Sequence, residues 1–432
     1  MSLLTRQGYI VAFDDFTPSQ AKELTVIAEK SPMYANDARP FEIFENRLDG
    51  TIAVPRYWGE DNFGPAKKMF GHIYTSKRLI FEGKFRSDIQ KDVADKSIKQ
   101  LKNHGGGVLS LHTGFGKTII SLYLACALKL KTLVVVHKQF LLDQWEQRIN
   151  TFVPFARVGR LQQSIEDVDD CDIVVGMLQS IAMRQYDDDV FSDFGFVIFD
   201  EVHVVPAPVF SRALLRLSAP YMLGLSATPT RRDGLSRVIH WFIGPIFFTH
   251  SLKEKDDVTV EVVDFKIGRN LPMNMVAATT ILCNMTGRNL LIVQKIKTLV
   301  DAGHKVILLS DRRAHCEALK LLLYKEGVVG ALYLGGIKPF ELQQSIKKQV
   351  LFCTYGIAKE GLDVPSLDAL VLATPRSEIV QACGRILHGK TKNLPVIVDI
   401  VDQWFVGRAQ FNKRKKYYVE SGFTLMYNQS NI

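Results

Sequence analysis

The glycine-containing segment 111–118, with the sequence LHTGFGKT, restricts the fold more than any other part of the chain. It lies between two apolar runs, as is typical of the turn from a β-strand into a helix. Two glycines let backbone N–H groups converge on an anion, and the start of the helix adds its positive dipole end. We therefore predict a phosphate-binding loop formed by Thr113, Gly114 and Gly116, in which Lys117 pairs with the β and γ phosphates and Thr118 holds Mg²⁺. An ordinary turn is the alternative, because the strict pattern begins with glycine and this loop begins with leucine.

A second segment, 196–203 with the sequence FVIFDEVH, ends an apolar run in two adjacent carboxylates. Such a run is typical of a buried parallel strand, and α/β sheets bind ligands beyond the carboxyl ends of their strands. We therefore expect both acids beside the phosphate loop. Asp200 is predicted to hold Mg²⁺, and Glu201 to orient and deprotonate the water that attacks the γ-phosphate. A solvated helix cap is the alternative for two acids at this place.

Six further motifs occur in a fixed order around these two segments. They are FRSDIQ at 85–90, VVVHK at 134–138, VVGMLQS at 174–180, SAT at 226–228, TYGIAKEGLD at 354–363 and QACGR at 381–385. In this order and spacing, the eight motifs resemble those of superfamily 2 helicases and translocases, over residues 85 to 400. The resemblance implies two RecA-like domains in tandem, ATP as the nucleotide and a nucleic acid as the partner.

The resemblance also implies roles for individual residues. Arg86 and Gln90 would read the adenine, Gly361 and Asp363 would bind the nucleotide from the second domain, and Arg385 would be the arginine finger that meets charge on the γ-phosphate. The residues that would couple the nucleotide to the nucleic acid are His203, Ser226, Thr228 and Gln381. The residues that would contact the nucleic acid are His137, Lys138, Gly176, Ser180, Arg231, Arg232 and Thr354.

Within the superfamily, the chain is most similar to the XPB and UvsW branch and to the transcript-release helicases of large DNA viruses. The segments DEVHVVPA at 200–207 and LSATPTRRDG at 225–234 carry this similarity, which implies 3′-to-5′ movement on DNA. Two positions depart from the pattern. Arg232 is basic where XPB-type proteins have an acid, and His388 stands where the sixth motif has a second arginine. Histidine is not a permanent cation, which leaves three alternatives. Either Arg385 acts alone, or Lys390 substitutes for the missing arginine, or turnover is slow.

Positive charge is concentrated towards the C-terminus. Residues 251–432 carry 25 basic and 17 acidic side chains, an excess of 8 out of the net +9. A basic surface there would bind nucleic-acid phosphates by counterion release. The densest cluster is Lys413, Arg414, Lys415 and Lys416, followed by two tyrosines that could stack on bases. A solvated helix face is the alternative for this cluster.

The fold class predicted from alternating strands and helices is α/β, with parallel sheets. We expect a small α+β accessory domain at 1–84, a first RecA-like ATP-binding domain at 85–250 and a second at 251–432. Predicted elements include helices over 19–30, 118–128 and 140–149 and strands over 132–136 and 305–310. In the accessory domain, Arg56, Tyr57, Trp58, Lys67 and Lys68 suit nucleic-acid binding, with core aromatics as the alternative.

Composition predicts the redox state of the cysteines and the cellular location of the protein. Six scattered cysteines without a Cys-x-x-Cys pair predict reduced core residues rather than a zinc or iron–sulfur site. No apolar run approaches the ~20 residues that span a bilayer, and the N-terminus lacks a signal-peptide pattern. We expect no membrane association and a cytoplasmic or nuclear location, or the virion if the source is a virus.

These features predict a monomeric, DNA-stimulated ATPase that acts as a helicase or translocase on single-stranded, forked or branched DNA, with transcription or repair proteins as partners. One alternative is a duplex translocase that displaces a polymerase or transcript, or remodels branched DNA, without processive unwinding. Another is a helicase-like scaffold subunit that hydrolyses ATP weakly because of His388.

Overall fold

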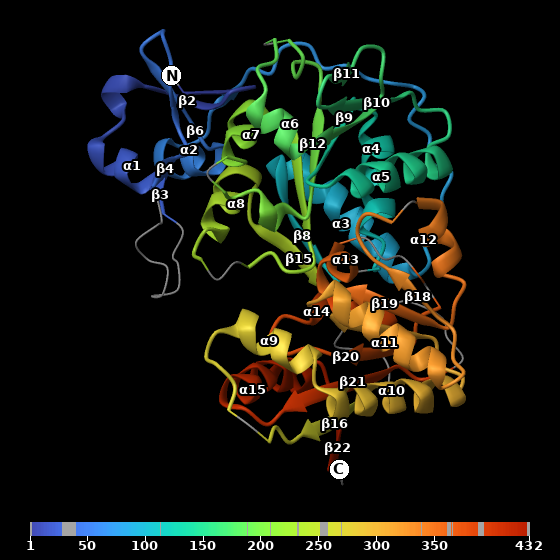
Figure 1. Cartoon of the computed structure of the whole chain (residues 1–432). Coiled ribbons are helices and arrows are strands. Elements are labelled where there is room, and N and C mark those ends of the chain that lie inside the picture. The colour runs from blue at the N-terminus through green and yellow to red at the C-terminus, as the bar shows by residue number, and fades with distance from the viewer. Residues whose placement is uncertain are drawn as a thin grey trace. The chain divides into compact units, whose positions relative to one another are not determined.

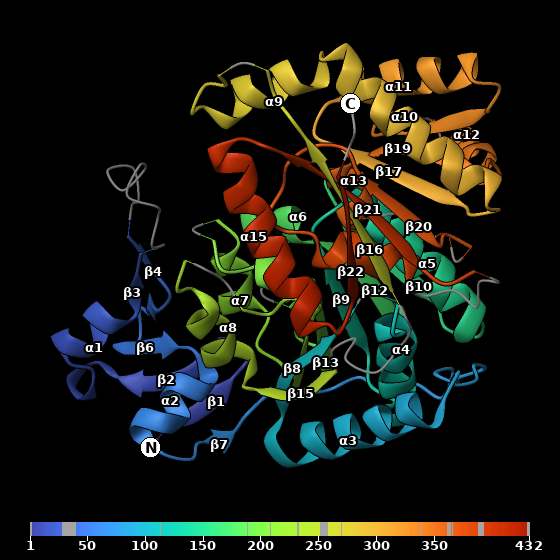
Figure 2. The same ribbon diagram turned by 90° about the horizontal axis from the view of Figure 1, so that it is seen from below.

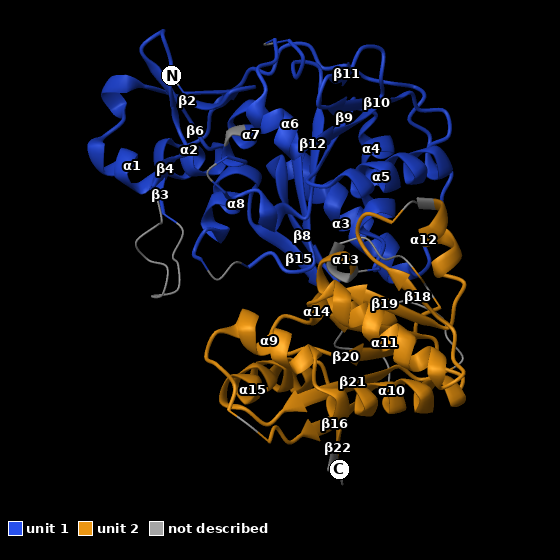
Figure 3. Ribbon diagram, viewed as in Figure 1, with its two compact units in different colours: residues 1–250 blue, residues 251–432 orange. Residues whose placement is uncertain are grey.

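The structure is a computed structural model that divides into two compact units, Met1–His250 and Ser251–Ile432 (Figure 3). It describes residues 2–27, 40–112, 114–187, 189–207, 209–230, 233–250, 258–268, 270–337, 339–360, 364, 366–387 and 393–429. Both units are built on parallel sheets with intervening helices, which confirms the predicted α/β class. The described residues before position 85 belong to the first unit, where they form a five-stranded sheet and a separate two-stranded sheet that pairs Thr25–Val26 with Phe41–Glu42.

The N-terminal sheet has the strand order β5-β6-β2-β1-β7, coloured blue in Figure 1. Strands β1 and β7 pair in parallel and the other neighbours are antiparallel. The elements are β1 (Leu3–Thr5), β2 (Gly8–Ala12), η1 (Phe13–Asp15), α1 (Pro18–Glu23), β3 (Thr25–Val26), β4 (Phe41–Glu42), β5 (Glu45–Asn46), β6 (Thr51–Val54), α2 (Arg56–Phe63) and β7 (Lys67–Lys68).

The helix predicted over 19–30 has the wrong bounds, because α1 begins at Pro18 and ends at Glu23. Helix α1 is capped by Thr17, whose Oγ1 accepts a hydrogen bond from Gln20 N at 3.3 Å, while Gln20 Oε1 accepts one from Thr17 N at 2.9 Å. This reciprocal capping box starts the helix earlier than a serine cap at position 19 would. The helix ends at Glu23 because the chain turns into β3, and residues 28–30 lie outside the described part.

Helix α2 carries interior residues rather than a nucleic-acid surface. Trp58 is buried among the N-terminal strands, and Arg56, also buried, donates hydrogen bonds to the carbonyls of His104 and Pro220, both at 3.2 Å. Trp58 is therefore a core aromatic, the alternative given above. The hydrogen bonds of Arg56 connect the N-terminal sheet to segments next to the large sheet. Lys67 and Lys68 on β7 are exposed.

The large sheet of the first unit has, among the described residues, eight strands in the order β11-β10-β12-β9-β13-β14-β8-β15. Only β10 and β11 pair antiparallel there. The strands are β8 (Gly106–Leu111), β9 (Thr132–Val136), β10 (Val158–Gln162), β11 (Ile165–Asp167), β12 (Ile173–Met177), β13 (Phe196–Asp200), β14 (Tyr221–Ser226) and β15 (Ile246–His250). Strand β9 has the predicted bounds.

Helices cover both faces of this sheet (Figures 1 and 2). One face packs against α3 (Asp88–His104), α4 (Lys117–Leu128) and α5 (Gln139–Phe152); the other packs against α6 (Leu178–Met183), α7 (Ser211–Arg216) and α8 (Ser236–Ile243). Neighbouring residues such as Val134 and Val135 point into opposite cores. Because both faces are buried, the strands are continuous apolar runs, and polar chemistry is left to the loops at their ends.

The sheet of the second unit has the order β18-β19-β17-β20-β21-β16-β22, and every neighbouring pair in its described part is parallel. Its strands are β16 (Thr259–Phe265), β17 (Val306–Ser310), β18 (Gly330–Tyr333), β19 (Val350–Thr354), β20 (Ala369–Leu372), β21 (Val396–Asp402) and β22 (Thr424–Gln429). Its helices are α9 (Met275–Cys283), α10 (Thr286–Asp301), α11 (Arg313–Lys325), α12 (Pro339–Ser345), α13 (Tyr355–Glu360), α14 (Val380–Cys383), η4 (Gly384–Ile386) and α15 (Phe405–Glu420).

In this unit α10 and α11 pack on one face of the sheet, and α13, α14 and α15 on the other. All six cysteines of the chain are buried and none forms a disulfide. Among the described residues no single helix is long and apolar enough to cross a membrane, although α9 and α10 would pass that test together and are bent by 69° at the break between them.

Candidate ATP site and nucleic-acid contacts

The phosphate loop connects β8 to α4. Gly114 and Gly116 have φ angles of 77° and 102°, in the left-handed region that glycine adopts without strain. A Cβ atom at Gly116 would also lie 2.6 Å from Gln90 Nε2, so a side chain at this position would displace the end of Gln90. Helix α4 begins at Lys117, and its first N–H groups face the loop. Thr113 lies outside the described residues.

The acid pair lies at the carboxyl end of β13, where the sequence places it. Lys117 Nζ is 3.7 Å from Glu201 Oε1 and donates a hydrogen bond to the Leu111 carbonyl at 3.4 Å. Glu201 has a φ angle of 52°, a left-handed conformation that is unusual for a residue with a side chain. Strained backbone of this kind is concentrated at functional sites, where the surrounding structure enforces it.

The two acids differ in electrostatic environment. Burial, and the neighbouring Glu201 charge, raise the pKa of Asp200. Burial also disfavours the charged form of Glu201, but Lys117 and a hydrogen bond with His203 outweigh it and lower the pKa of Glu201 to about 2. Glu201 is therefore a carboxylate at neutral pH. If a phosphate drew Lys117 away, Glu201 would lose its main stabilising charge and become a stronger base.

Asp200 has a partner that no motif predicted. Trp145, a buried residue of α5, donates a hydrogen bond from Nε1 to Asp200 Oδ2 at 2.9 Å. The sequence signal is weak, because a tryptophan on the apolar side of an amphipathic helix is expected in the core whether or not its N–H is used.

Three of the residues predicted to couple nucleotide and nucleic acid lie together. His203 Nδ1 is 3.3 Å from Glu201 Oε2 and 2.9 Å from Ser226 Oγ, and Ser226 Oγ accepts a hydrogen bond from Thr228 N at 3.0 Å. Strand β14, which ends at Ser226, lies between β13 and β8 in the sheet. A continuous chain of polar contacts thus runs from the acid pair to the segment that follows β14.

Gln90 bridges its own motif to the phosphate loop. Its Oε1 accepts a hydrogen bond from Arg86 N at 2.6 Å, and its Nε2 donates one to the Phe115 carbonyl. The side chain is buried, whereas Arg86 is exposed. Gln90 therefore holds the loop in place, and adenine reading by these two residues stays a prediction.

Some residues predicted to contact nucleic acid lie in the interior of the first unit. Gly176 is buried within β12, where it pairs with Val135 and Leu161, and Ser180 is buried with its Oγ accepting a hydrogen bond from Gln163 N at 2.9 Å. The sheet and α6 therefore enclose both residues, and contact of this segment with nucleic acid stays a prediction.

His137 is also buried, and its charge would act on Glu201, so its side chain belongs to the acid site rather than to an outer surface. Lys138 is half-exposed, and its contact with nucleic acid stays a prediction.

In the second unit, Thr354 ends β19 and is half-exposed, Gln381 is buried on α14, and Arg385 lies in η4 directly after α14. The contact between α13 and α14 brings the segments after Thr354 and around Gln381 together. The predicted residues outside the described part are Arg231, Arg232, Gly361, Asp363 and His388, with Lys390.

The basic cluster on α15 is only partly a surface. Lys413, Lys415 and Lys416 are exposed, but Arg414 is 2% exposed and forms a bidentate ion pair with Asp399, with both distances 2.8 Å. Tyr418 is buried and donates a hydrogen bond to the same carboxylate. The predictions that Arg414 contacts phosphate and that this tyrosine stacks on bases are wrong, since helix periodicity turns positions 414 and 418 towards the sheet.

Arg414→Ala should destabilise the second unit by about 3–5 kcal/mol, because it leaves the Asp399 charge buried without its partner. Lys413→Ala, one residue earlier on the exposed side, should change stability by no more than about 0.5 kcal/mol. Denaturant unfolding of both variants measures the difference. Equal stabilities would contradict the structural role of the ion pair.

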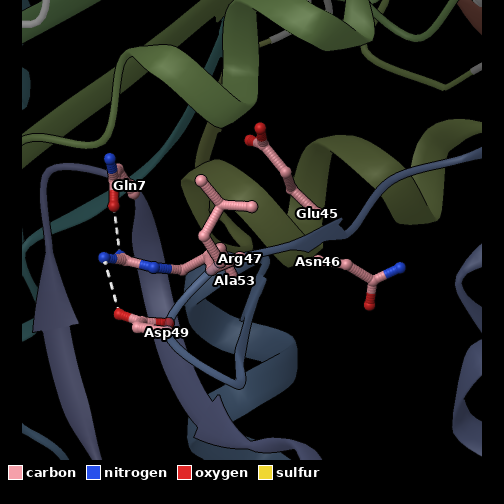
Figure 4. Close-up of a pocket in the computed structure, with 7 residues that line it drawn as sticks. Gln7, Glu45, Asn46, Arg47, Asp49 and Ala53 are labelled. Atoms are coloured by element: carbon pink, nitrogen blue, oxygen red, sulfur yellow. Dashed lines mark hydrogen bonds and ion pairs between the residues drawn. The ribbon is translucent and has the colours of Figure 1, made fainter.

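A hollow of about 320 Å³ lies elsewhere, on the N-terminal sheet (Figure 4). Arg47 crosses it, contacting Gln7 and forming an ion pair with Asp49 at 3.1 Å. The residues lining it are Gln7, Glu45, Asn46, Arg47, Leu48, Asp49 and Ala53. None of these belongs to a predicted motif.

The donors beside the phosphate loop suit one kind of metal. The Thr118 hydroxyl and the Asp200 carboxylate are hard oxygen ligands, and Mg²⁺ is typically bound by one or two such side chains together with substrate phosphates. The residues therefore fit Mg²⁺ held jointly with a nucleotide.

The fold and this site define the class as superfamily 2 helicases, which hydrolyse ATP. Residues 84–231 match the family model described as the type III restriction enzyme, res subunit. The chain is 36% identical over 444 residues to a protein of Acanthamoeba polyphaga mimivirus that is named an ATP-dependent RNA helicase; the match covers 96% of this chain and 83% of that protein. The chain thus belongs to the superfamily 2 helicases, in a group with helicases of large DNA viruses.

Two further comparisons agree. An African swine fever virus protein (strain Badajoz 1971 Vero-adapted), also named an ATP-dependent RNA helicase, is 25% identical over 402 residues, which are 83% of this chain and 79% of that protein. The solved structure of a Saccharomyces cerevisiae Dbp5 variant bound to RNA and ADP–BeF3 covers 80% of this chain and 90% of that chain, with 14% identity and a TM-score of 0.54. This second likeness shows a shared fold.

Proposed function

We propose that this helicase couples hydrolysis of Mg·ATP to 3′-to-5′ movement along DNA. The observation that supports it best is the chain of contacts from Lys117 through Glu201 and His203 to Ser226, which joins the nucleotide-binding loop to the segment after β14. A change at the γ-phosphate would alter the partner of Lys117 and could be transmitted along this chain.

In the proposed reaction, the loop amides and Lys117 bind the β and γ phosphates, and Glu201 orients the attacking water and accepts its proton. Thr118 and Asp200 would hold Mg²⁺, whose positive charge would offset that of the phosphates. Arg385 would stabilise the charge that develops on the transferred group. Loss of that group would remove the γ-phosphate contacts of Lys117 and so change the partner of Glu201, as in other nucleotide switches.

The DNA assignment is supported by the similarity to XPB and UvsW and by the basic excess of residues 251–432. A second candidate is action on RNA, which the names of the mimivirus and African swine fever virus relatives favour. The backbone phosphates of DNA and RNA attract basic residues equally. Only contacts that depend on the 2′-hydroxyl, which RNA has and DNA lacks, can distinguish the two nucleic acids.

The test compares ATP turnover with single-stranded DNA, duplex DNA and RNA of matched sequence at equal nucleotide concentration. We expect the largest stimulation with DNA that has a single-stranded 3′ tail, and strand displacement on forked but not blunt duplexes. Larger stimulation by RNA would overturn the DNA assignment. Stimulation by duplex DNA without displacement would support a translocase, and turnover insensitive to any nucleic acid would support the scaffold alternative.

Replacing Lys413, Lys415 and Lys416 together with Ala should weaken nucleic-acid binding and flatten its salt dependence. Each lost phosphate contact lowers the slope of log K against log[salt] by about 0.7–0.9. Fluorescence anisotropy at several salt concentrations measures this slope. The matched control replaces the same three lysines with Arg, which keeps the charge and should keep the slope. An unchanged slope in the Ala variant would assign these lysines to a merely solvated helix face.

A further inference from the structure

The buried indole of Trp145 contacts the acid pair at one defined point. Its only polar atom, Nε1, is 2.9 Å from Asp200 Oδ2, although the two residues are 55 positions apart in the sequence. The contact joins the helix that follows β9 to the end of the neighbouring strand β13. Tertiary packing therefore brings a hydrogen-bond donor to the back of the predicted metal-binding carboxylate.

Both oxygens of Asp200 are held from the protein side. Oδ1 accepts a hydrogen bond from Glu201 N at 3.1 Å, and Oδ2 accepts the one from Trp145. Two donors fix the plane of a carboxylate, and each oxygen keeps a lone pair for another ligand. An indole N–H can only donate, so the contact favours a carboxylate that acts purely as an acceptor.

We propose that Trp145 is a positioning residue, whose indole N–H orients the Asp200 carboxylate towards Mg²⁺ bound with the nucleotide. The inference rests on the proposed Mg·ATP site and adds a residue outside every recognised motif. Hydrogen-bond partners of metal-binding side chains commonly change metal affinity or activity by about 10–100-fold. Trp145 also packs in the core with Leu142 and Ile149, so an experiment must separate packing from the hydrogen bond.

Trp145→Phe removes the N–H and keeps an aromatic ring in the core. The matched control is Trp58→Phe, because Trp58 is equally buried and its Nε1 has no hydrogen-bond partner among the described residues. Calorimetry measures ADP affinity for the wild type and both variants, in EDTA and in Mg²⁺. We expect similar affinities in EDTA, and a gain from Mg²⁺ that is about 10-fold smaller in Trp145→Phe alone.

An equal Mg²⁺ gain in the two variants would overturn the role of Trp145. A wild-type chain without any Mg²⁺ gain would instead overturn the Mg·ATP site, and the inference with it.

A second measurement needs no folded Trp145 variant. In wild-type protein with ¹⁵N-labelled indoles, the signals of Trp58, Trp241 and Trp404 are assigned from their Phe variants, and the fourth signal is Trp145. Adding Mg²⁺ to the ADP-bound chain should shift the Trp145 signal and leave that of Trp58 in place. No shift at Trp145 while ADP affinity responds to Mg²⁺ would overturn the inference.

Discussion

Lys117→Ala should lower ATP turnover by at least about 10²-fold while most nucleic-acid affinity remains, because loss of one preorganised donor at developing charge has this size of effect. Lys117 is the first residue of α4, and its Nζ already lies 3.7 Å from Glu201 Oε1, inside the site rather than on an outer surface. Steady-state ATPase assays and fluorescence anisotropy of labelled DNA measure the two quantities separately.

A second variant in the site and a control variant accompany this test. Glu201→Gln should bind ATP but turn it over about 10²–10⁴-fold more slowly, since it removes the proposed general base. Lys96→Ala is the control, because Lys96 is an exposed lysine on α3 that pairs with Asp92. Normal turnover in either Lys117→Ala or Glu201→Gln would show that the ATP site has been assigned to the wrong residues.

Arg385→Ala is expected to reduce stimulated kcat by about 10³–10⁵-fold, the range found for arginine fingers in other NTPases. The residue lies in η4, directly after α14, so the sheet of the second unit supports its backbone. ATPase assays with saturating nucleic acid give kcat and KM separately, and the loss should fall mainly on kcat, because the charge it meets develops only in the transition state.

Arg385→Lys tests whether the finger needs the planar guanidinium as well as its positive charge. It keeps a positive charge but loses the planar fork, so its activity should lie between those of the wild type and the Ala variant. His388→Arg should keep or raise kcat if a second permanent charge is useful at this place. Full activity in Arg385→Ala would mean that another cation is the finger.

The ATP site was the part most open to prediction. The loop glycines and the lysine at the start of α4 lie within four consecutive residues, the acid pair occupies two consecutive residues at the end of β13, and the geometry of each segment follows from local backbone rules. The order of strands in a parallel sheet then brings the carboxyl ends of β8, β13 and β14 together, so residues 117, 201 and 226 could be expected at one edge.

Predictions of surface contacts were less successful, because burial depends on parts of the chain that are distant in sequence. Arg414 stands between exposed lysines, and only the approach of Asp399 in β21 shows that it is internal. Gly176 and Ser180 belong to a motif associated with nucleic acid, yet their neighbours in the folded sheet enclose them.

The sequence by itself determined the α/β class and the helicase family and predicted the residues of the ATP site, because these are carried by short motifs and by apolar periodicity. Only the tertiary structure decided which charged and polar side chains are internal: Arg56 on the carbonyls of His104 and Pro220, Arg414 on Asp399, and Trp145 on Asp200. The physical reason is that a buried polar group must meet its partner in the folded core, and that partner can lie anywhere along the chain.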